Sequence, residues 1–192
     1  ILNINYQNTI DEFTKLGVKK AETFYSKKVQ THLFNQIEIG EISKYQFLNQ
    51  LQKETKNASV KQVELAWNAM LLELPEERFQ LIKKLKNSHA IYLLSNTNSI
   101  HVNAIMKKLG NEKWLEFCKL FNKMYLSHKL GLRKPNVKIF EYILKDQKLK
   151  AEEVFFIDDS LQHIVGAKEI GIHCHHLLDN EDITSLFADI TL

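Results

Sequence analysis

Two adjacent carboxylates, Asp158 and Asp159, directly follow a run of apolar residues at positions 154–157. Two like charges about 4 Å apart repel each other by roughly 4 kcal/mol at an effective dielectric constant of about 20. A fold that places them side by side at the end of a buried strand therefore needs a compensating group, and a bound cation would supply it. Mg²⁺ suits the pair because it prefers hard carboxylate oxygens and takes only one or two of them, keeping several water ligands.

A second polar group, Ser95, Asn96 and Thr97, follows the apolar residues 90–94 and precedes a helical pattern. A hydroxyl and free backbone N–H groups at the start of a helix form a ready site for an anion. Capping of the helix by Ser95 or Asn98 is the simpler explanation for this stretch taken alone.

A lysine before a proline, Lys134 and Pro135, follows the apolar residues 123–126, the second such run in chain order. The proline disfavours helical geometry in the residue before it, so the ammonium group can point towards the ends of the strands. A solvated lysine is the alternative for this dipeptide by itself. The coincidence of three such groups at three strand ends is much rarer than any one of them, and together they predict a site for a cation and an anion.

The apolar runs that end in these groups alternate with helical patterns after Pro75. We expect strands at residues 90–94, 123–126, 154–157 and 172–176. Strand–helix alternation predicts an α/β fold, with a parallel sheet covered by helices on both faces. Ligands of such sheets bind beyond the carboxyl ends of the strands, where all three polar groups lie.

The first third of the chain, from about Tyr6 to Leu74, has a helical pattern throughout. Apolar residues recur at helical spacing in three segments, the last of which has Ser59 as its expected N-cap. The residues expected on the buried faces are Ile10, Phe13 and Leu16, then Tyr45, Leu48 and Leu51, and finally Val63, Ala66, Trp67 and Met70. We therefore divide the chain into a helical unit, residues 6–74, and an α/β unit, residues 1–5 and 75–192.

Composition excludes several classes of protein. Hydrophobic residues make up 44% of the 192 residues and charged residues 26%, and no apolar stretch approaches the roughly 18 residues of a membrane helix. The net charge of +3 is spread along the chain without a basic block, which argues against a nucleic-acid partner. Two widely separated cysteines, Cys118 and Cys174, favour a reducing cytoplasm.

Three motifs in order resemble those of the haloacid dehalogenase-like hydrolase superfamily: "LLSNTN" with Ser95, "GLRKP" with Lys134, and "FFIDDS" with Asp158 and Asp159. A helix and strand with the sequence "AKEIGI" follow, as in that family. "LNINYQNTIDEF", "GEIS" and Trp67 further resemble its helical-capped branch, which includes bacterial sugar-phosphate phosphatases such as glucose-1-phosphate phosphatase. The resemblance implies a Rossmann-like core with an inserted helical cap.

The resemblance also implies roles for individual residues. Ser95 and Lys134 would be catalytic, Ser95 by hydrogen-bonding a phosphoryl oxygen and Lys134 by balancing charge on the phosphate and its attacking group. Asp159 would ligate Mg²⁺ with support from Asp158. Where many relatives carry a carboxylate or amide that supports the lysine, four residues after the metal ligand, this chain has His163.

Substrate binding is expected at both sides of the site. Ser95, Asn96 and Thr97 would hold the phosphoryl group from the core, while Trp67 and the loop at Glu41 would choose the substrate from the cap. The expected partner is a small phosphomonoester such as a sugar phosphate, and the expected assembly is a monomer or a weak homodimer.

One part of the family pattern has no counterpart in the sequence. Family members begin with a central strand that ends in an aspartate nucleophile, and "ILNINYQNT" resembles the segment just after it. We therefore expect the natural protein to have about 10–20 further residues before Ile1, enough for a strand and its loop. The reaction implied is attack by that aspartate on a phosphomonoester and hydrolysis of the resulting aspartyl-phosphate.

Other functions remain open at this point. A haloacid dehalogenase needs no Mg²⁺, so the aspartate pair argues against it, and a response-regulator receiver carries its acidic pair first in the chain, not last. A non-catalytic binding protein of the same fold, lacking the nucleophile, is the third alternative. "HCHH", residues 173–176, invites a metal site, but alternation along a strand sends its side chains to opposite faces, so an ordinary strand is the expected structure.

Overall fold

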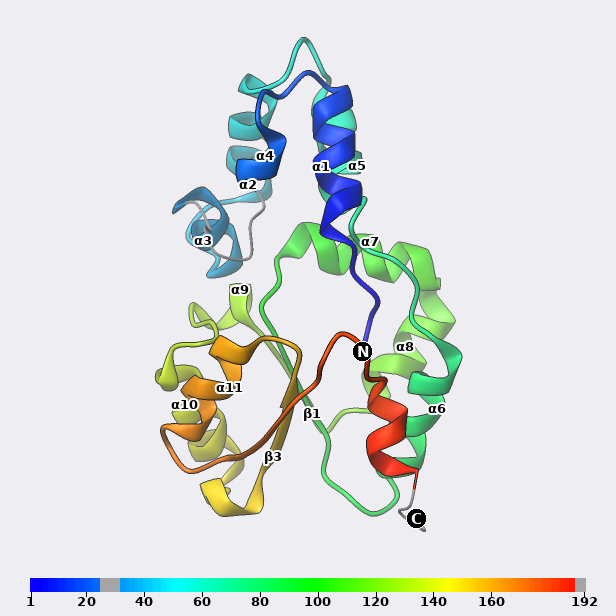
Figure 1. Cartoon of the computed structure of the whole chain (residues 1–192), viewed down its shortest axis with the longest axis vertical. Coiled ribbons are helices and arrows are strands. Elements are labelled where there is room, and N and C mark those ends of the chain that lie inside the picture. Colours follow the sequence, from blue (N-terminus) through cyan, green and yellow to red (C-terminus); the bar gives the residue numbers. More distant parts are fainter. Residues whose placement is uncertain (25–31, 189–192) are drawn as a thin grey trace.

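The computed structural model describes residues 1–24 and 32–188. Helices occupy one end of the elongated molecule and a mixture of strands and helices the other (Figure 1). The chain enters the helical end after Asn5 and returns through residues 69–74, and the two passages pair in an antiparallel bridge between Ile4 and Leu71. None of the helices in the described ranges is long and apolar enough to cross a membrane.

The helical end matches the sequence pattern closely. Ser43 and Ser59 each cap a helix with a reciprocal capping box, through Gln46 and Gln62, which satisfies two N-terminal donors at each helix. The helices are α1 (Tyr6–Lys15), α2 (Ala21–Phe24), α3 (His32–Glu38), α4 (Lys44–Lys53) and α5 (Val60–Asn68). Residues 25–31, for which the sequence predicts a continuing helical pattern, lie outside the described residues.

The core of the helical end contains most of the predicted apolar faces. Phe13, Leu48 and Val63 are all buried there. Tyr45 was wrongly predicted to be buried, since its side chain is 72% exposed. The buried face of α4 instead runs through Phe47, Leu48 and Leu51, and Tyr45 lies on the other side of the helix.

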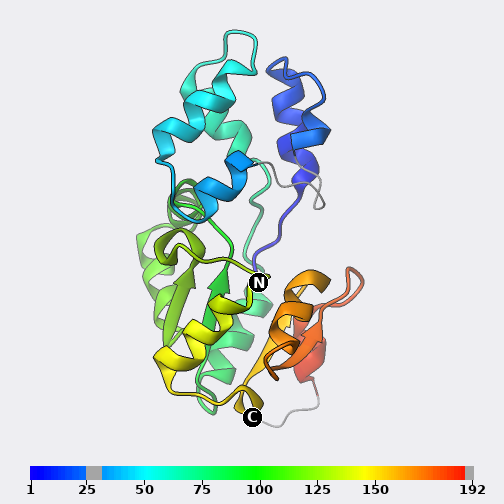
Figure 2. The ribbon, with the colours of Figure 1, turned by 90° about the vertical axis from the view of Figure 1, so that its left-hand side faces the viewer.

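The other end contains four parallel-paired strands with helices around them (Figure 2). Strand β2 has the predicted bounds, β3 is shifted by one residue, and β1 is shifted by two at its start and extends to Ser95. The elements are α6 (Glu76–Leu85), β1 (Tyr92–Ser95), α7 (Ser99–Leu109), α8 (Asn111–Lys119), β2 (Lys123–Leu126), α9 (Ser127–Leu130), α10 (Val137–Gln147), η1 (Ala151–Glu153), β3 (Phe155–Asp158), α11 (Leu161–Lys168), β4 (His173–His176) and η2 (Ile183–Phe187). The α/β fold with parallel strands and flanking helices is thus confirmed.

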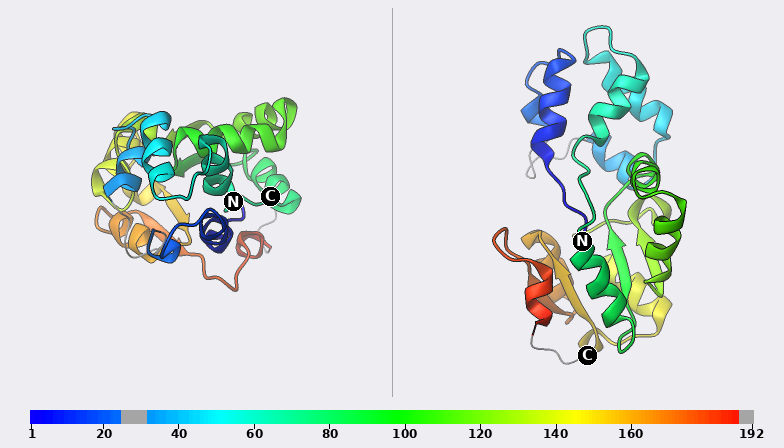
Figure 3. Two further views of the ribbon diagram at one scale, coloured as in Figure 1. Left: turned by 90° about the horizontal axis from the view of Figure 1, so that it is seen from above. Right: turned by 90° about the vertical axis from the view of Figure 1, so that its right-hand side faces the viewer.

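The strands form two halves instead of one continuous sheet. β1 pairs with β2, and β3 pairs with β4, but within the described residues no ladder joins the two pairs. Figures 2 and 3 show the two halves on either side of the N-terminus. In the described residues β1 and β3 therefore each keep an unpaired edge on the inside of the fold.

Helix α7 connects the α/β end to the helical end. The His101 ring stacks on Trp67, with ring centroids 5.0 Å apart, and His101 Nε2 lies 3.4 Å from the Trp67 carbonyl oxygen. Lys108, about two turns further along the same face of α7, donates a 3.0 Å hydrogen bond to the carbonyl oxygen of Leu71 in the returning passage. The same helix that follows β1 thereby fixes the place where the helical end joins the rest.

The burial of His101 makes stability depend on pH. Burial lowers the pKa of His101 from 6.5 to about 4, although its contact with the Trp67 carbonyl acts in the opposite direction. Between pH 6.5 and 4, His101 therefore binds a proton in the unfolded chain but not in the folded chain. The free energy of unfolding falls as pH decreases through this window, by at most about 3 kcal/mol. We expect urea unfolding at pH 7 and pH 4.5 to show a smaller pH effect in His101→Gln than in the wild type. Equal pH effects in the two proteins would contradict this assignment.

Candidate active site

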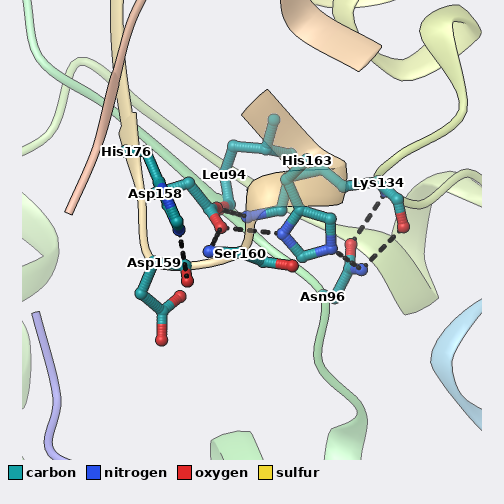
Figure 4. Close-up of polar contacts among 8 residues, drawn as sticks. All are labelled: Leu94, Asn96, Lys134, Asp158, Asp159, Ser160, His163 and His176. Atoms are coloured by element: carbon teal, nitrogen blue, oxygen red, sulfur yellow. Dashed lines mark hydrogen bonds and ion pairs between the residues drawn. The ribbon is translucent and has the colours of Figure 1, made fainter. Parts of the chain in front are cut away.

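Lys134 connects the two halves of the strand layer. Its ammonium group donates to the Leu94 carbonyl oxygen at 3.1 Å and to Asp158 Oδ2 at 2.5 Å (Figure 4). Lys134 is 5% exposed, so this is a buried ion pair at the carboxyl ends of β1 and β3. The predicted approach of Lys134 to the acidic strand end is confirmed.

The backbone of Lys134 is fixed by the side chain of Asn96. Asn96 Oδ1 accepts from the Lys134 N–H, and Asn96 Nδ2 donates to the Lys134 carbonyl oxygen, both at 2.9 Å. The peptide bond between Lys134 and Pro135 is cis. The sequence predicts that Asn96 binds substrate; in the structure both ends of its amide contact the backbone of Lys134, so the contacts of Asn96 hold Lys134 in place.

Thr97 is also engaged within the protein. Its N–H donates to Ser127 Oγ, and the same hydroxyl donates back to the Thr97 carbonyl oxygen, both at 2.9 Å. The next residue, Asn98, caps α7 by accepting from the N–H groups of Ile100 and His101. The N–H of Thr97 is therefore not available to an anion, and capping, the simpler alternative, holds for Asn98. Ser127 was missed, although a serine directly after the predicted strand 123–126 was a usable signal.

The two adjacent aspartates have different surroundings. The Asp158 side chain is 8% exposed and accepts from Lys134, from the Ser160 N–H at 2.9 Å and from His163, whose Nδ1 is 2.8 Å from Oδ1. Burial alone would raise the pKa of Asp158, but the His163 hydrogen bond and the Lys134 charge hold this pKa well below its usual range. Asp158 therefore carries a negative charge that balances the Lys134 ammonium group.

Asp159 has an exposed side chain that points away from this cluster (Figure 4). Its carbonyl oxygen lies 3.3 Å from His176 Nε2, but its carboxylate has no hydrogen bond or ion pair within the described residues. The hydroxyl of Ser95, at the end of β1, likewise has no hydrogen-bond partner there. These two groups remain able to bind a ligand, whereas Lys134 and Asp158 hold each other.

His163 replaces the family's usual support for the lysine without contacting the lysine itself. Its ring bonds Asp158 on one side, and its Nε2 lies 3.5 Å from Asn96 Nδ2 on the other. The support of Lys134 comes instead from Asp158 and from the carbonyl oxygen of Leu94. The histidine thus orients the carboxylate that holds the lysine, a role one step further from the ammonium group.

The donor set at this edge fits Mg²⁺. The Asp159 carboxylate offers free, exposed hard oxygens, and Mg²⁺ needs only one or two carboxylates because it keeps several waters. No group of three or more histidine, cysteine, aspartate or glutamate side chains in the described residues could hold a metal by itself. The "HCHH" segment forms strand β4, as expected; His175 contacts Glu181, with 3.2 Å between Nε2 and Oε2.

The two cap residues expected to contact substrate lie in different environments. Trp67 is only 3% exposed and stacks between Phe34 and His101, so its burial supports a packing role and not substrate contact. Glu41 is exposed on the loop after α3. In that loop Gly40 has φ of +73°, and a Cβ there would come within 2.3 Å of the His128 carbonyl oxygen, so the loop lies directly against the core.

A close approach of α11 to the lysine loop gives a testable packing prediction. A Cβ added at Gly166 would lie 2.2 Å from the Pro135 carbonyl oxygen, next to Lys134. We expect Gly166→Ala to lower the free energy of unfolding by about 1–3 kcal/mol, because the backbone must move apart. It should also lower activity, since α11 follows Asp158 and Pro135 follows Lys134. Thermal or urea unfolding tests the first effect. Gly110→Ala is the comparison variant, because a Cβ at exposed Gly110 meets nothing within 4 Å. Since φ of Gly110 is +77°, this variant gives the cost of backbone strain without a clash.

Known proteins resemble the chain over nearly its whole length. Residues 5–171 match the family described as haloacid dehalogenase-like hydrolase. A D-ribitol-5-phosphate phosphatase from Bacteroides thetaiotaomicron is 32% identical over 175 residues, which are 89% of this chain and 84% of that protein. The name of that relative describes an enzyme that acts on a polyol phosphate.

Solved structures give the same result. An enzyme of the HAD family from Bacteroides thetaiotaomicron, crystallised as an aspartate-to-alanine mutant with magnesium and inorganic phosphate, has a TM-score of 0.91 and 31% identity. The match covers 97% of this chain and 93% of that one. A predicted HAD-like family hydrolase from Porphyromonas gingivalis has a TM-score of 0.84 and 30% identity, over 98% of this chain and 93% of that one.

Proposed function

Because the chain belongs to the haloacid dehalogenase-like hydrolases, we propose that it is a Mg²⁺-dependent phosphatase of small phosphomonoesters, with a sugar or polyol phosphate as substrate. The observation that carries this proposal is that the polar residues at the strand ends fall into two pairs with different surroundings. Lys134 and Asp158 form a buried, fixed pair, while the side chains of Asp159 and Ser95 next to them have no hydrogen bond among the described residues. A phosphoryl group needs such a combination of a positioned ammonium group, a hydroxyl donor and a carboxylate that can hold a metal ion.

Each residue has a defined part in this proposal. Asp159 would hold Mg²⁺, and the bound ion would offset the negative charge of the phosphoryl group. Ser95 would donate its hydroxyl proton to a phosphoryl oxygen. Lys134, already positioned by Asn96 and Asp158, would stabilise the charge that develops in the transition state, and a preorganised donor of this kind lowers a barrier by about 3–4 kcal/mol.

We place the attacking carboxylate on a strand between β1 and β3. Both strands have unpaired inner edges in the described residues, and the Lys134 ammonium group spans the interval between Leu94 and Asp158. A strand in this interval would pair with both edges and would bring its last side chain next to Lys134. The cap, for which we propose the range 6–74, would cover this carboxylate and exclude bulk water.

The test is the release of inorganic phosphate by the protein as its gene encodes it. We expect release from D-ribitol 5-phosphate, glucose 1-phosphate or another member of a phosphomonoester panel in the presence of Mg²⁺, and its loss when EDTA is added. Turnover of a haloacid without metal would instead favour a dehalogenase. No turnover of any ester, with the attacking carboxylate in place, would favour a non-catalytic binding protein.

We further propose a cytoplasmic protein that is a monomer or a weak homodimer. Cys118 and Cys174 are both free thiols, as a reducing compartment allows. Light scattering coupled to size exclusion, repeated over a range of concentrations, distinguishes a monomer from a dimer that dissociates on dilution.

A further inference from the structure

Arg133, the residue just before Lys134, extends from the core to the cap. Its Nη1 donates a 2.7 Å hydrogen bond to Asn35 Oδ1, and its Nε lies 3.0 Å from Glu38 Oε2. Asn35 and Glu38 both belong to α3, and the Arg133 and Glu38 side chains are only 16% and 18% exposed. A mostly buried ion pair thus joins cap and core one residue away from the lysine of the site.

This ion pair is not completed by hydrogen bonds. Glu38 Oε2 and Arg133 Nε are both buried, and neither has a hydrogen-bond partner within the described residues, despite the short distance between them. A buried polar atom without a hydrogen bond costs about 1–3 kcal/mol. Both side chains nevertheless keep a small exposed fraction, so a ligand that reaches their other polar atoms can add the hydrogen bonds that the pair lacks.

The Arg133–Glu38 pair interacts electrostatically with charged residues of the proposed site. Burial raises the pKa of Glu38, and the positive charges of Arg133 and then Lys134 oppose this rise. Tyr6, the first residue of α1, is influenced from both sides: after burial, the charges of Asp159 and Glu38 raise the pKa of its hydroxyl. Glu38 is thus within interaction range of Lys134 and Tyr6, and Tyr6 is within range of Asp159. Polar groups continue from the phosphoryl end of the site to the cap.

We propose that Glu38 and Arg133 bind hydroxyl groups of the alcohol part of the substrate, which makes them determinants of specificity for a polyol or sugar phosphate. The inference rests on the proposed phosphatase function. A hydroxyl can donate to the carboxylate and accept from the guanidinium at the same time, so one hydroxyl group can bind both side chains. An ester of an apolar or aromatic alcohol would leave them unpaired.

The chemistry of hydroxyl recognition sets the size of the effect. A site built to hydrogen-bond a hydroxyl rejects an analogue that lacks it by up to about 10⁴-fold, because its own polar groups are left without partners. A pair that served only to tie the cap to the core would have a different consequence. Its loss would slow the hydrolysis of every ester by the same factor.

The experiment compares kcat/KM for two esters, D-ribitol 5-phosphate and p-nitrophenyl phosphate, which has no aliphatic hydroxyl. We expect Glu38→Gln to lower the ratio of polyol to aromatic ester at least about 10-fold. The matched control is Glu64→Gln. Like Glu38, Glu64 is a carboxylate of the cap that forms an ion pair, in this case with Lys44, whose Nζ is 2.5 Å away. This control should keep the wild-type ratio.

A second variant protects the test against misfolding. Arg133→Lys keeps the positive charge but loses the planar set of donors, and it should lower the same ratio; thermal unfolding of both variants shows that they are folded. An unchanged ratio in these variants, or an equal loss on both esters, would overturn the inference while leaving the phosphatase function in place. Absence of phosphate release by the wild type from every ester would overturn the function and the inference together.

Discussion

Asp159→Asn is expected to lower kcat/KM for phosphate-ester hydrolysis by about 10³-fold while leaving the free energy of unfolding almost unchanged. The carboxylate is exposed and has no hydrogen bond or ion pair in the part of the chain that the structure describes, so its removal disrupts no packing. The substitution does remove the hard, charged oxygens that Mg²⁺ requires. Function and stability should therefore separate at this residue.

Three measurements check this prediction. Phosphate release gives kcat/KM, titration with Mg²⁺ shows whether more metal is needed, and urea unfolding gives the stability. Asp11→Asn is the matched control, since Asp11 is an exposed aspartate on α1 that contacts only Gln7 through its side chain among the described residues. Near-normal activity of Asp159→Asn at low Mg²⁺ would exclude Asp159 as the metal ligand.

Asp158→Asn is expected to destabilise the fold by about 3–5 kcal/mol. The substitution removes the only carboxylate that the described residues bring to the Lys134 ammonium group, and Lys134 is just 5% exposed. Breaking a buried ion pair at one partner leaves the other charge without compensation, which costs more than the intact pair contributes. The two adjacent substitutions thus have different expected effects: Asp159→Asn lowers activity, and Asp158→Asn lowers stability.

A double-mutant cycle tests the origin of this effect. Lys134→Met removes the buried charge, so Asp158→Asn should cost much less in the Lys134→Met background than in the wild type. Urea unfolding of the four proteins gives the coupling energy directly. Loss of less than about 1 kcal/mol in the single Asp158→Asn variant would mean that water or a relaxed lysine compensates the charge.

The sequence predicted the elements better than their ends. Apolar runs predict strands, and β2 has the predicted bounds because its pairing with β1 ends where the predicted run ends, at Leu126. β1 instead continues to Ser95, a polar residue that still pairs in register with Leu126. Tyr45 was assigned to a buried face by spacing alone, but which side of α4 meets the core depends on how the neighbouring helices pack, as the full burial of Phe47 shows.

At the site, the residue types were predictable and several of their contacts were not. The spacing and the family resemblance both singled out Lys134, Asp158 and Asp159. They could not tell which aspartate neutralises the lysine, because that depends on the direction in which each side chain leaves β3. Asn96 was assigned to substrate for a related reason: an asparagine after a strand can bind a ligand, and only the fold brings the backbone of Lys134 within its reach.

Lys134 holds the Leu94 carbonyl oxygen and Asp158 together across two strand pairs that share no ladder in the described residues. It therefore links the two strand pairs structurally, in addition to the catalytic role that we propose for it. A library of variants screened for soluble expression alone, with no demand for turnover, should still retain lysine here. A lysine at this position in a related protein would consequently not indicate that the protein is an enzyme. Retention or loss of the aspartate at position 159 would indicate it.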